Sequence, residues 1–214
     1  MLKRRKREGI IYWHGNSGSN RVALTFDDGP NEPYTSQILD ILAKYDARAT
    51  FFMIGRNVEV FPKAAEKVAR AGHVIGNHTY SHRGPLLSTP TRIANEISQA
   101  EKVIKEVTSI SPYLFRPPYG ATSLGILRQA EKLGYVVSHW SVNAGDWRGA
   151  DPKKIKKKVL GQVEDGAIIL MHDGRNLAAG HDRTSTVTAL PEIILSLKDR
   201  GFSLVTLPQL LGLE

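Results

Sequence analysis

The sequence predicts an α/β protein built around a parallel sheet. Seven short apolar segments alternate with segments of helical periodicity, which is the pattern of repeated β/α units. The strand candidates are mainly apolar and do not alternate with polar residues, as expected for strands that are buried on both faces. Polar residues directly follow several of these strands. In parallel α/β folds that edge of the sheet carries the active site.

The seven predicted strands share a high content of β-branched, aromatic and other apolar residues. They are residues 22–26, 49–54, 73–77, 113–115, 135–142, 167–171 and 202–206. A polar segment, residues 16–20, leads into the first of them. The alternation leaves two architectures open, since seven strands could form an irregular barrel or an open doubly wound sheet.

The predicted helices carry apolar residues at intervals of three and four. They are residues 34–45, 61–71, 91–108, 124–133, 152–163 and 184–200, followed by a short terminal helix. Gly72, Gly134 and Gly201 each follow one of these segments and favour its termination. Pro62 stands near the start of another, where proline is tolerated.

Size and composition indicate one globular domain. The chain has 214 residues, 41% hydrophobic and 23% charged, without an internal repeat or a linker. We expect residues 1–20 to form a basic arm and flexible lead, and residues 21–214 to form the domain. Because cysteine is absent, disulfides and thiolate metal sites are excluded, and any metal must be held by His, Asp or Glu.

The basic run from Lys3 to Arg7 contributes strongly to a formal net charge of +8. Such an arm could contact nucleic acid or an anionic cell surface, or it could be a disordered or juxtamembrane leader. No basic patch interleaved with aromatic residues supports nucleic-acid binding. The apolar run at residues 10–13 is shorter than the roughly 7–15 residues of a signal-peptide core. Either export does not use a standard signal, or the given start lacks one.

Two adjacent carboxylates end the first predicted strand. Asp27 and Asp28 precede Gly29 and Pro30, which favour a turn. Successive side chains on a strand point to opposite faces, so these two differ in environment unless the strand end twists. Two carboxylates in different environments can divide the roles of base and metal ligand. The alternative is a polar turn without further function.

His78 and His82 are four residues apart after the third predicted strand. On a helical turn both imidazoles would lie on one face, within reach of one cation. Two solvated histidines are the alternative. With Asp28 at the same edge, two histidines and one carboxylate would leave a coordination position open for water, as in catalytic metal sites.

A rigid segment, Arg116-Pro117-Pro118-Tyr119-Gly120, follows the fourth predicted strand. The prolines restrict the backbone, so Arg116 could be held to orient a carboxylate, and the Tyr119 N–H could face developing negative charge. A stiff loop with a surface arginine is the alternative.

Asp146, Trp147 and His172 complete the polar edge. A histidine that ends a buried strand is often only hydrogen-bonded to a loop. Held by a carboxylate such as Asp146, His172 would be oriented and more readily protonated, as an acid catalyst requires. Trp147 could form a pocket wall or lie at the edge of the core.

Five segments resemble, in order, the motifs of the polysaccharide deacetylase (NodB-homology) family, carbohydrate esterase family four. They are Thr25-Phe26-Asp27-Asp28-Gly29, His78-Thr79-Tyr80-Ser81-His82, Arg116-Pro117-Pro118-Tyr119-Gly120, Asp146-Trp147 and Leu170-Met171-His172. The resemblance extends over roughly residues 21–210. It implies a distorted (β/α) barrel, commonly of seven parallel strands, in which residues 21–214 are the catalytic domain.

The resemblance also implies the role of each site residue. Asp28, His78 and His82 would hold one divalent metal ion, usually zinc but sometimes cobalt or nickel. Asp27 would be the general base, oriented by Arg116, and His172 the general acid, tethered by Asp146. The backbone N–H of Tyr119 would stabilise the oxyanion. Trp147 and Leu170 would line the pocket for the acetyl methyl group.

The implied reaction removes N-acetyl groups from N-acetylglucosamine-containing polysaccharide, either peptidoglycan or chitin-like oligomers, and releases acetate. Alternatives on the same site are O-deacetylation of acetylxylan and a non-catalytic glycan-binding or spore-coat role. The resemblance implies an extracellular or cell-surface protein, and we expect a monomer. One departure is Asn143, where relatives often carry an acid.

Overall fold

The computed structural model describes residues 11–84, 89–175 and 182–214 of the chain. The predicted basic arm from Lys3 to Arg7 lies outside these residues. The loop between Gly174 and Asp182, expected to border a substrate groove, lies largely outside them as well. None of the helices in the described ranges combines the length and the apolar character that crossing a bilayer requires.

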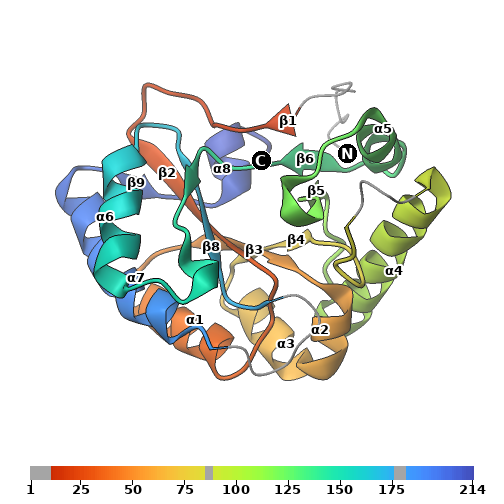
Figure 1. The fold of residues 1–214 in the computed structure, drawn as a ribbon, viewed down its shortest axis with the longest axis horizontal. Helices are drawn as coiled ribbons and strands as arrows, with labels where there is room; N and C mark the ends of the chain where they lie inside the picture. The colour runs from red at the N-terminus through yellow and green to blue at the C-terminus, as the bar shows by residue number, and fades with distance from the viewer. Residues whose placement is uncertain (1–10, 85–88, 176–181) are drawn as a thin grey trace.

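A parallel sheet forms the centre of the molecule (Figure 1). Its strands are β1 (Ile11–Tyr12), β2 (Arg21–Asp27), β3 (Ala49–Met53), β4 (Val74–Asn77), β5 (Leu114–Phe115), β6 (Val136–Ser138), β7 (Val142–Asn143), β8 (Ile168–His172) and β9 (Ser203–Leu204). Eight follow the order β1-β6-β5-β4-β3-β2-β8-β7, and β9 pairs with β2. The predicted α/β class is confirmed.

A very short connection links β6 and β7, two strands that lie near opposite ends of this order. β6 lies next to one end and β7 forms the other, yet only residues 139–141 separate them. The His139 N–H donates to Tyr12 O at 2.8 Å, and the Ser141 N–H donates to Ile168 O at 3.1 Å. The sheet must therefore curve until its ends approach, which identifies a distorted barrel rather than an open sheet.

The predicted count of seven strands was too low. The segment predicted as one strand, residues 135–142, is divided into β6, which pairs with β1 and β5, and β7, which pairs with β8. β1 was not predicted at all, and it lies in the segment expected to be a flexible lead. A two-residue strand has too little pattern to be recognised from sequence.

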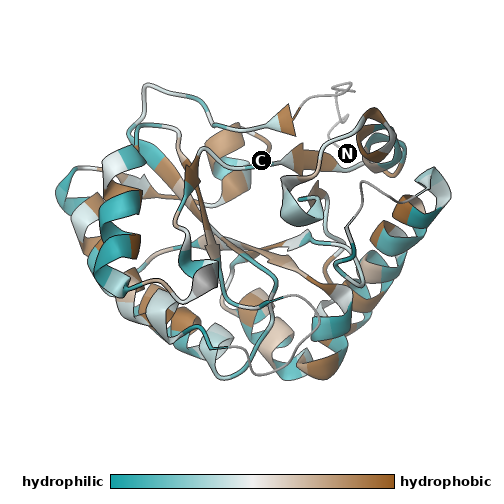
Figure 2. Ribbon diagram, viewed as in Figure 1, coloured by the Kyte–Doolittle hydropathy of each residue, from teal (hydrophilic) through white to brown (hydrophobic). Residues whose placement is uncertain are grey.

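The helices cover the outside of the barrel (Figure 1). They are α1 (Tyr34–Lys44), α2 (Gly55–Val60), α3 (Pro62–Arg70), α4 (Pro90–Thr108), α5 (Leu124–Lys132), α6 (Pro152–Gln162), α7 (Thr184–Asp199) and α8 (Leu207–Leu211). All were predicted within two residues at each end except α2, which was not predicted, and α8, the short terminal helix, for which no bounds were given. Figure 2 shows hydrophobic strands inside and helices that are hydrophilic on the side away from them.

The strand register fixes which residues meet at the polar edge. Asp27, the last residue of β2, is level with His172 at the end of β8. Asn77, the last residue of β4, is level with Phe115 of β5, so His78 and Arg116 leave neighbouring strands together. The strands that lead to these residues, β4 and β5, are almost wholly buried, as are β2 and β8.

Candidate active site

The Asp27–Asp28 pair lies where β2 changes into a turn. Asp28 has a φ of 74°, a left-handed conformation that few residues other than glycine adopt. The Asn57 side-chain amide donates to Asp28 O at 2.7 Å and holds this turn. The strand end thus twists, and both carboxylates face one imidazole. His78 Nε2 is 3.3 Å from Asp28 Oδ1 and 3.8 Å from Asp27 Oδ2.

His78 and His82 lie in a loop rather than on the helical turn that we expected. Thr79 and His82 have φ values of 69° and 50°. The Thr79 N–H donates to Asn77 Oδ1 at 2.9 Å, and the His82 N–H donates to Thr79 Oγ1 at 3.1 Å. These side-chain bonds fold the loop back on itself, so the two rings still meet, with centroids 4.9 Å apart.

Asp28, His78 and His82 form a buried cluster that could hold a metal ion. Their ligand atoms lie within 4.8 Å of one another, and His82 Nε2 is 3.0 Å from Asp28 Oδ1. His78 Nδ1 is 2.6 Å from the carbonyl oxygen of Arg116 and must donate a proton to it. Its Nε2 faces the Asp28 carboxylate, where the ring lone pair would be available to a metal ion. Such convergence of lone pairs fits a divalent cation.

The Asp28 carboxylate stays ionised in this cluster. Burial by itself would raise its pKa, but the His78 and His82 rings that face it, together with His172, hold the pKa well below the usual range. A deprotonated carboxylate and two imidazoles are a hard-to-borderline donor set of the kind that zinc and similar ions accept.

Arg116 is completely buried and is anchored on several sides. Nη1 donates to Asp27 Oδ1 at 2.7 Å and to Thr25 Oγ1 at 2.8 Å, while Nη2 donates to His139 O at 2.7 Å. The guanidinium lies 4.1 Å from the centroid of the Phe52 ring. One oxygen of Asp27 is therefore fixed by a charge-assisted bond. The other oxygen faces His78.

His172 is held by Asp146 in two ways. Asp146 Oδ1 is 2.8 Å from His172 Nδ1, and Asp146 Oδ2 accepts the His172 backbone N–H at 2.8 Å. Thr186 Oγ1 donates to Oδ2 at 2.8 Å and completes the support. Burial would lower the pKa of His172, but the Asp146 carboxylate outweighs it and raises the pKa to about 9. His172 is therefore an imidazolium at neutral pH.

The three residues predicted to contact the substrate lie in different settings. Leu170 is buried in β8, whereas Trp147 and Tyr119 are 41% and 65% exposed. The Tyr119 ring contacts His82 edge-on, with centroids 4.7 Å apart, and its backbone has a φ of 59°. Trp147 follows Asp146 in a short 3-10 helix (Asp146–Arg148). Their roles toward a substrate stay predictions.

Several supporting residues were missed from the sequence. Thr25, Asn57 and Thr186 contact Arg116, the Asp28 carbonyl and Asp146, respectively. Thr25 and Thr186 are fully buried. Thr25 is a polar residue within an apolar segment, and this was the available signal, whereas Thr186 stands among other hydroxyl residues and gave none. Asn143, the departure from the family pattern, accepts the Gly145 N–H at 2.8 Å and so supports the loop before Asp146.

Comparisons with known proteins find relatives that match nearly the whole chain. A peptidoglycan-N-acetylglucosamine deacetylase of Bacillus cereus is 37% identical over 215 residues, which cover 99% of this chain and 98% of that protein. A chitooligosaccharide deacetylase of Bradyrhizobium is 36% identical over 201 residues, with 91% and 92% covered.

A solved structure shares the fold. The crystal structure of the Bc1960 peptidoglycan N-acetylglucosamine deacetylase, in complex with 4-naphthalen-1-yl-N-oxidanyl-benzamide, has a TM-score of 0.90 and 36% identity, covering 94% of this chain and 92% of that one. The family model described as polysaccharide deacetylase matches residues 14–138. The chain therefore belongs to the polysaccharide deacetylase family.

Proposed function

We propose that the protein is a metal-dependent hydrolase that removes N-acetyl groups from N-acetylglucosamine-containing polysaccharide. The observation that carries the proposal is the shared strand edge. There Asp27 with Arg116, the cluster of Asp28, His78 and His82, and the His172–Asp146 pair converge. The named activities of the relatives on peptidoglycan and chitooligosaccharide support this substrate class.

Asp28, His78 and His82 would hold the metal, for which we propose zinc, with cobalt or nickel as alternatives. When bound, such an ion supplies a Lewis acid that polarises a carbonyl group and lowers the pKa of water. Asp27 acts as the general base and takes a proton from the attacking water. Arg116 keeps Asp27 oriented because it fixes one carboxylate oxygen at 2.7 Å.

His172 supplies the proton that the leaving nitrogen needs. An amide nitrogen is a very poor leaving group unless it is protonated, and His172 with a pKa of about 9 carries that proton at neutral pH. Water thus contributes its hydroxyl to the acetyl carbon and, through Asp27 and His172, a proton to nitrogen. The products are acetate and a free amine on the sugar.

The remaining residues shape the acetyl pocket. The Tyr119 backbone N–H donates to the developing oxyanion, an interaction that contributes about 3 kcal/mol at comparable sites. Leu170 and Trp147 surround the acetyl methyl group. Trp147 and Tyr119 are both partly exposed, as residues that touch a polymer from outside must be.

The substrate class implies where the protein acts. Peptidoglycan lies outside the membrane, so we infer an extracellular or cell-surface location for a monomer. Its single domain, expected at residues 21–214, also includes β1, which pairs with β6. The basic arm from Lys3 to Arg7 would add an electrostatic contact with the anionic cell surface, and we expect no nucleic-acid partner.

The test combines metal analysis with acetate release from chitooligosaccharides, peptidoglycan and acetylxylan. Release from either of the first two, with about one equivalent of divalent metal, supports the proposal. Release from acetylxylan alone would assign an O-deacetylase, because an alkoxide leaves more easily than an amine and the same site could expel it. Glycan binding without release from any substrate would instead identify a non-catalytic protein.

A further inference from the structure

Trp13 is an exposed indole that is held in one orientation. It directly follows β1 and is 50% exposed. Its ring stacks on His139, with centroids 4.2 Å apart and an angle of 23° between the planes. The preceding residue, Tyr12, is bonded through its carbonyl to the His139 N–H at 2.8 Å. One face of the indole is covered by the buried His139 ring, so the exposed surface of Trp13 lies mainly on the opposite face and the ring edges.

The ring beneath Trp13 is part of the frame of the active site. His139 is fully buried, and its carbonyl accepts from Arg116 Nη2 at 2.7 Å. His139 Nε2 is 3.1 Å from Thr122 Oγ1, whose hydroxyl also lies within 3.2 Å of Gly120 O. Through His139, Trp13 is therefore one residue removed from Arg116 and from Thr122.

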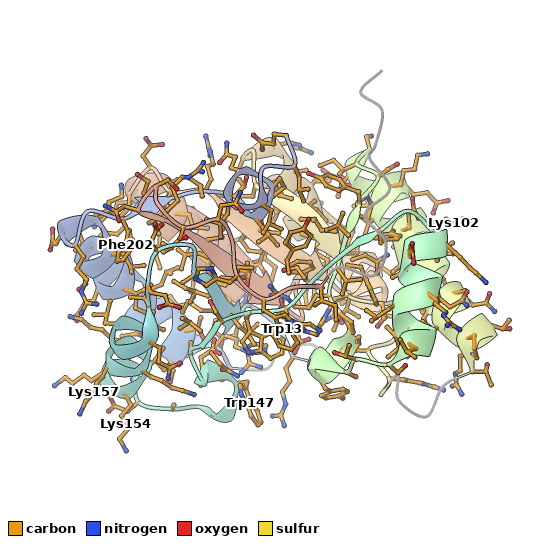
Figure 3. All side chains as sticks on the ribbon, turned by 90° about the horizontal axis from the view of Figure 1, so that it is seen from above. Trp13, Lys102, Trp147, Lys154, Lys157 and Phe202 are labelled. Carbon is orange, nitrogen blue, oxygen red and sulfur yellow. The ribbon has the colours of Figure 1, made fainter. Side chains whose placement is uncertain are left out.

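The exposed large aromatic residues of the described chain are concentrated around this edge. They are Trp13, Tyr119 and Trp147. Tyr119 contacts His82, Trp147 follows Asp146, and Trp13 covers His139. Figure 3 shows Trp13 near the middle of the view and Trp147 projecting at its lower edge. Exposed indoles lose apolar hydration when a flat apolar surface covers them, and the C–H faces of pyranose rings offer such a surface.

We propose that Trp13 forms a stacking subsite for a sugar unit of the polymer, at a distance from the unit whose acetyl group is hydrolysed. The inference rests on the proposed function and deepens it: the enzyme would recognise several consecutive N-acetylglucosamine units. Because His139 already fixes the indole, stacking of a sugar costs little side-chain entropy.

Length-dependent binding tests the subsite. In an Asp27→Asn background, which prevents turnover, affinities for N-acetylglucosamine oligomers of two to six units are measured by calorimetry. Trp13→Ala should weaken binding of the longest oligomer by roughly tenfold. Binding of the disaccharide should change by less than about twofold, because that ligand does not reach Trp13. Trp13→Tyr, which retains a flat ring, should restore most of the lost affinity.

Two further variants separate stacking from packing. Trp13→Leu keeps apolar cover on His139 without a flat ring, and it should bind long oligomers as weakly as Trp13→Ala. Leu195→Ala removes an exposed apolar side chain from α7 and should change no affinity. Equal weakening at every oligomer length would show that Trp13 acts only through His139 and Arg116, and it would overturn the subsite. Unchanged affinity at every length, or no binding of any oligomer, would also overturn it.

The proposed function can fail separately. If the wild-type protein releases no acetate but Trp13→Ala still loses affinity only for long oligomers, the subsite stands and the hydrolase does not. If acetate is released and the loss is independent of length, only the subsite fails.

Discussion

The different roles that we propose for Asp27 and Asp28 follow from the different environments of the two side chains. Asp27 and Asp28 are neighbours in sequence, yet Asp27 is bonded to Arg116 and Asp28 faces two imidazoles. The cause is local, because β2 ends at Asp27 and the next residue adopts a left-handed backbone. A strain of this kind persists only where surrounding contacts fix it, and it is concentrated at functional sites.

The His172–Asp146 pair predicts how kcat/KM depends on pH. The acid is active while protonated, so kcat/KM should fall as pH rises through the pKa of His172, which is about 9. In Asp146→Asn the carboxylate that raises this pKa is gone, and the basic limb of the pH profile should move to lower pH. Profiles of the wild type and the variant, measured side by side, check this.

A companion variant identifies the group that titrates. In His172→Ala the basic limb should disappear, and overall activity should fall by roughly 100- to 10,000-fold, the usual contribution of a general acid. A basic limb that stays in place in both variants would remove His172 from the role of acid.

At the scale of elements, α2 supports the turn that presents Asp28. Asn57 lies in this short helix and donates to the Asp28 carbonyl at 2.7 Å. Its removal leaves a buried carbonyl without that donor and loosens the left-handed turn. Supporting residues of this type commonly contribute about 10- to 100-fold to metal affinity.

Asn57→Ala should therefore weaken zinc binding by about tenfold or more, with the fold retained. Zinc affinity, measured by competition with a chelator, checks this expectation. Val60→Ala is a matched control, since Val60 is at the end of the same helix and is exposed. If the two variants bind zinc equally well, Asn57 has no supporting role.

The sequence was most informative where a pattern is local. Apolar runs and helical periodicity predicted most strands and helices to within two residues, and the polar residues after strands were correctly expected to gather at one edge. The break between β6 and β7 was missed because neither glycine nor proline marks it: the residues between the two strands are His139, Trp140 and Ser141. Only the pairing of β6 with β5 and of β7 with β8 divides that segment.

The site was predictable as a set of residue types but not as a set of contacts. The spacing of His78 and His82 pointed to one cation, yet a loop rather than a helix brings them together, through Thr79 and Asn77. Thr186 and Asn57 are distant in sequence from the residues that they hold. No local pattern reports such long-range hydrogen bonds, because the fold alone creates them.

At the scale of the whole molecule, barrel closure turns separate strand ends into one site. β2 and β8 bring Asp27 level with His172, while the connection through residues 139–141 supplies the carbonyl that holds Arg116. β2 and β8 lie near one end of the strand order and β6, which precedes this connection, lies near the other, and the curvature of the sheet brings them to the same site. The arrangement accounts for how five short motifs, spread from Thr25 to His172, can converge.

The positive net charge predicts an electrostatic contribution to the binding of cell walls. Deleting Lys3 to Arg7 removes five of the positive charges behind the formal net charge of +8. Binding to isolated cell walls should weaken on deletion at low salt, and the difference should vanish near 1 M salt, where the screening length is about 3 Å. Pull-down with cell walls over a salt series measures this. A salt-independent difference would exclude an electrostatic contact.

The central claim is that Asp27 is a base and Asp28 a metal ligand. It is tested most directly by the bound metal and the acetate release of Asp27→Asn, both measured on the same sample. We predict metal content equal to that of the wild type, with acetate release reduced at least about 100-fold. Loss of metal in proportion to activity, or retained activity, would contradict the division of roles.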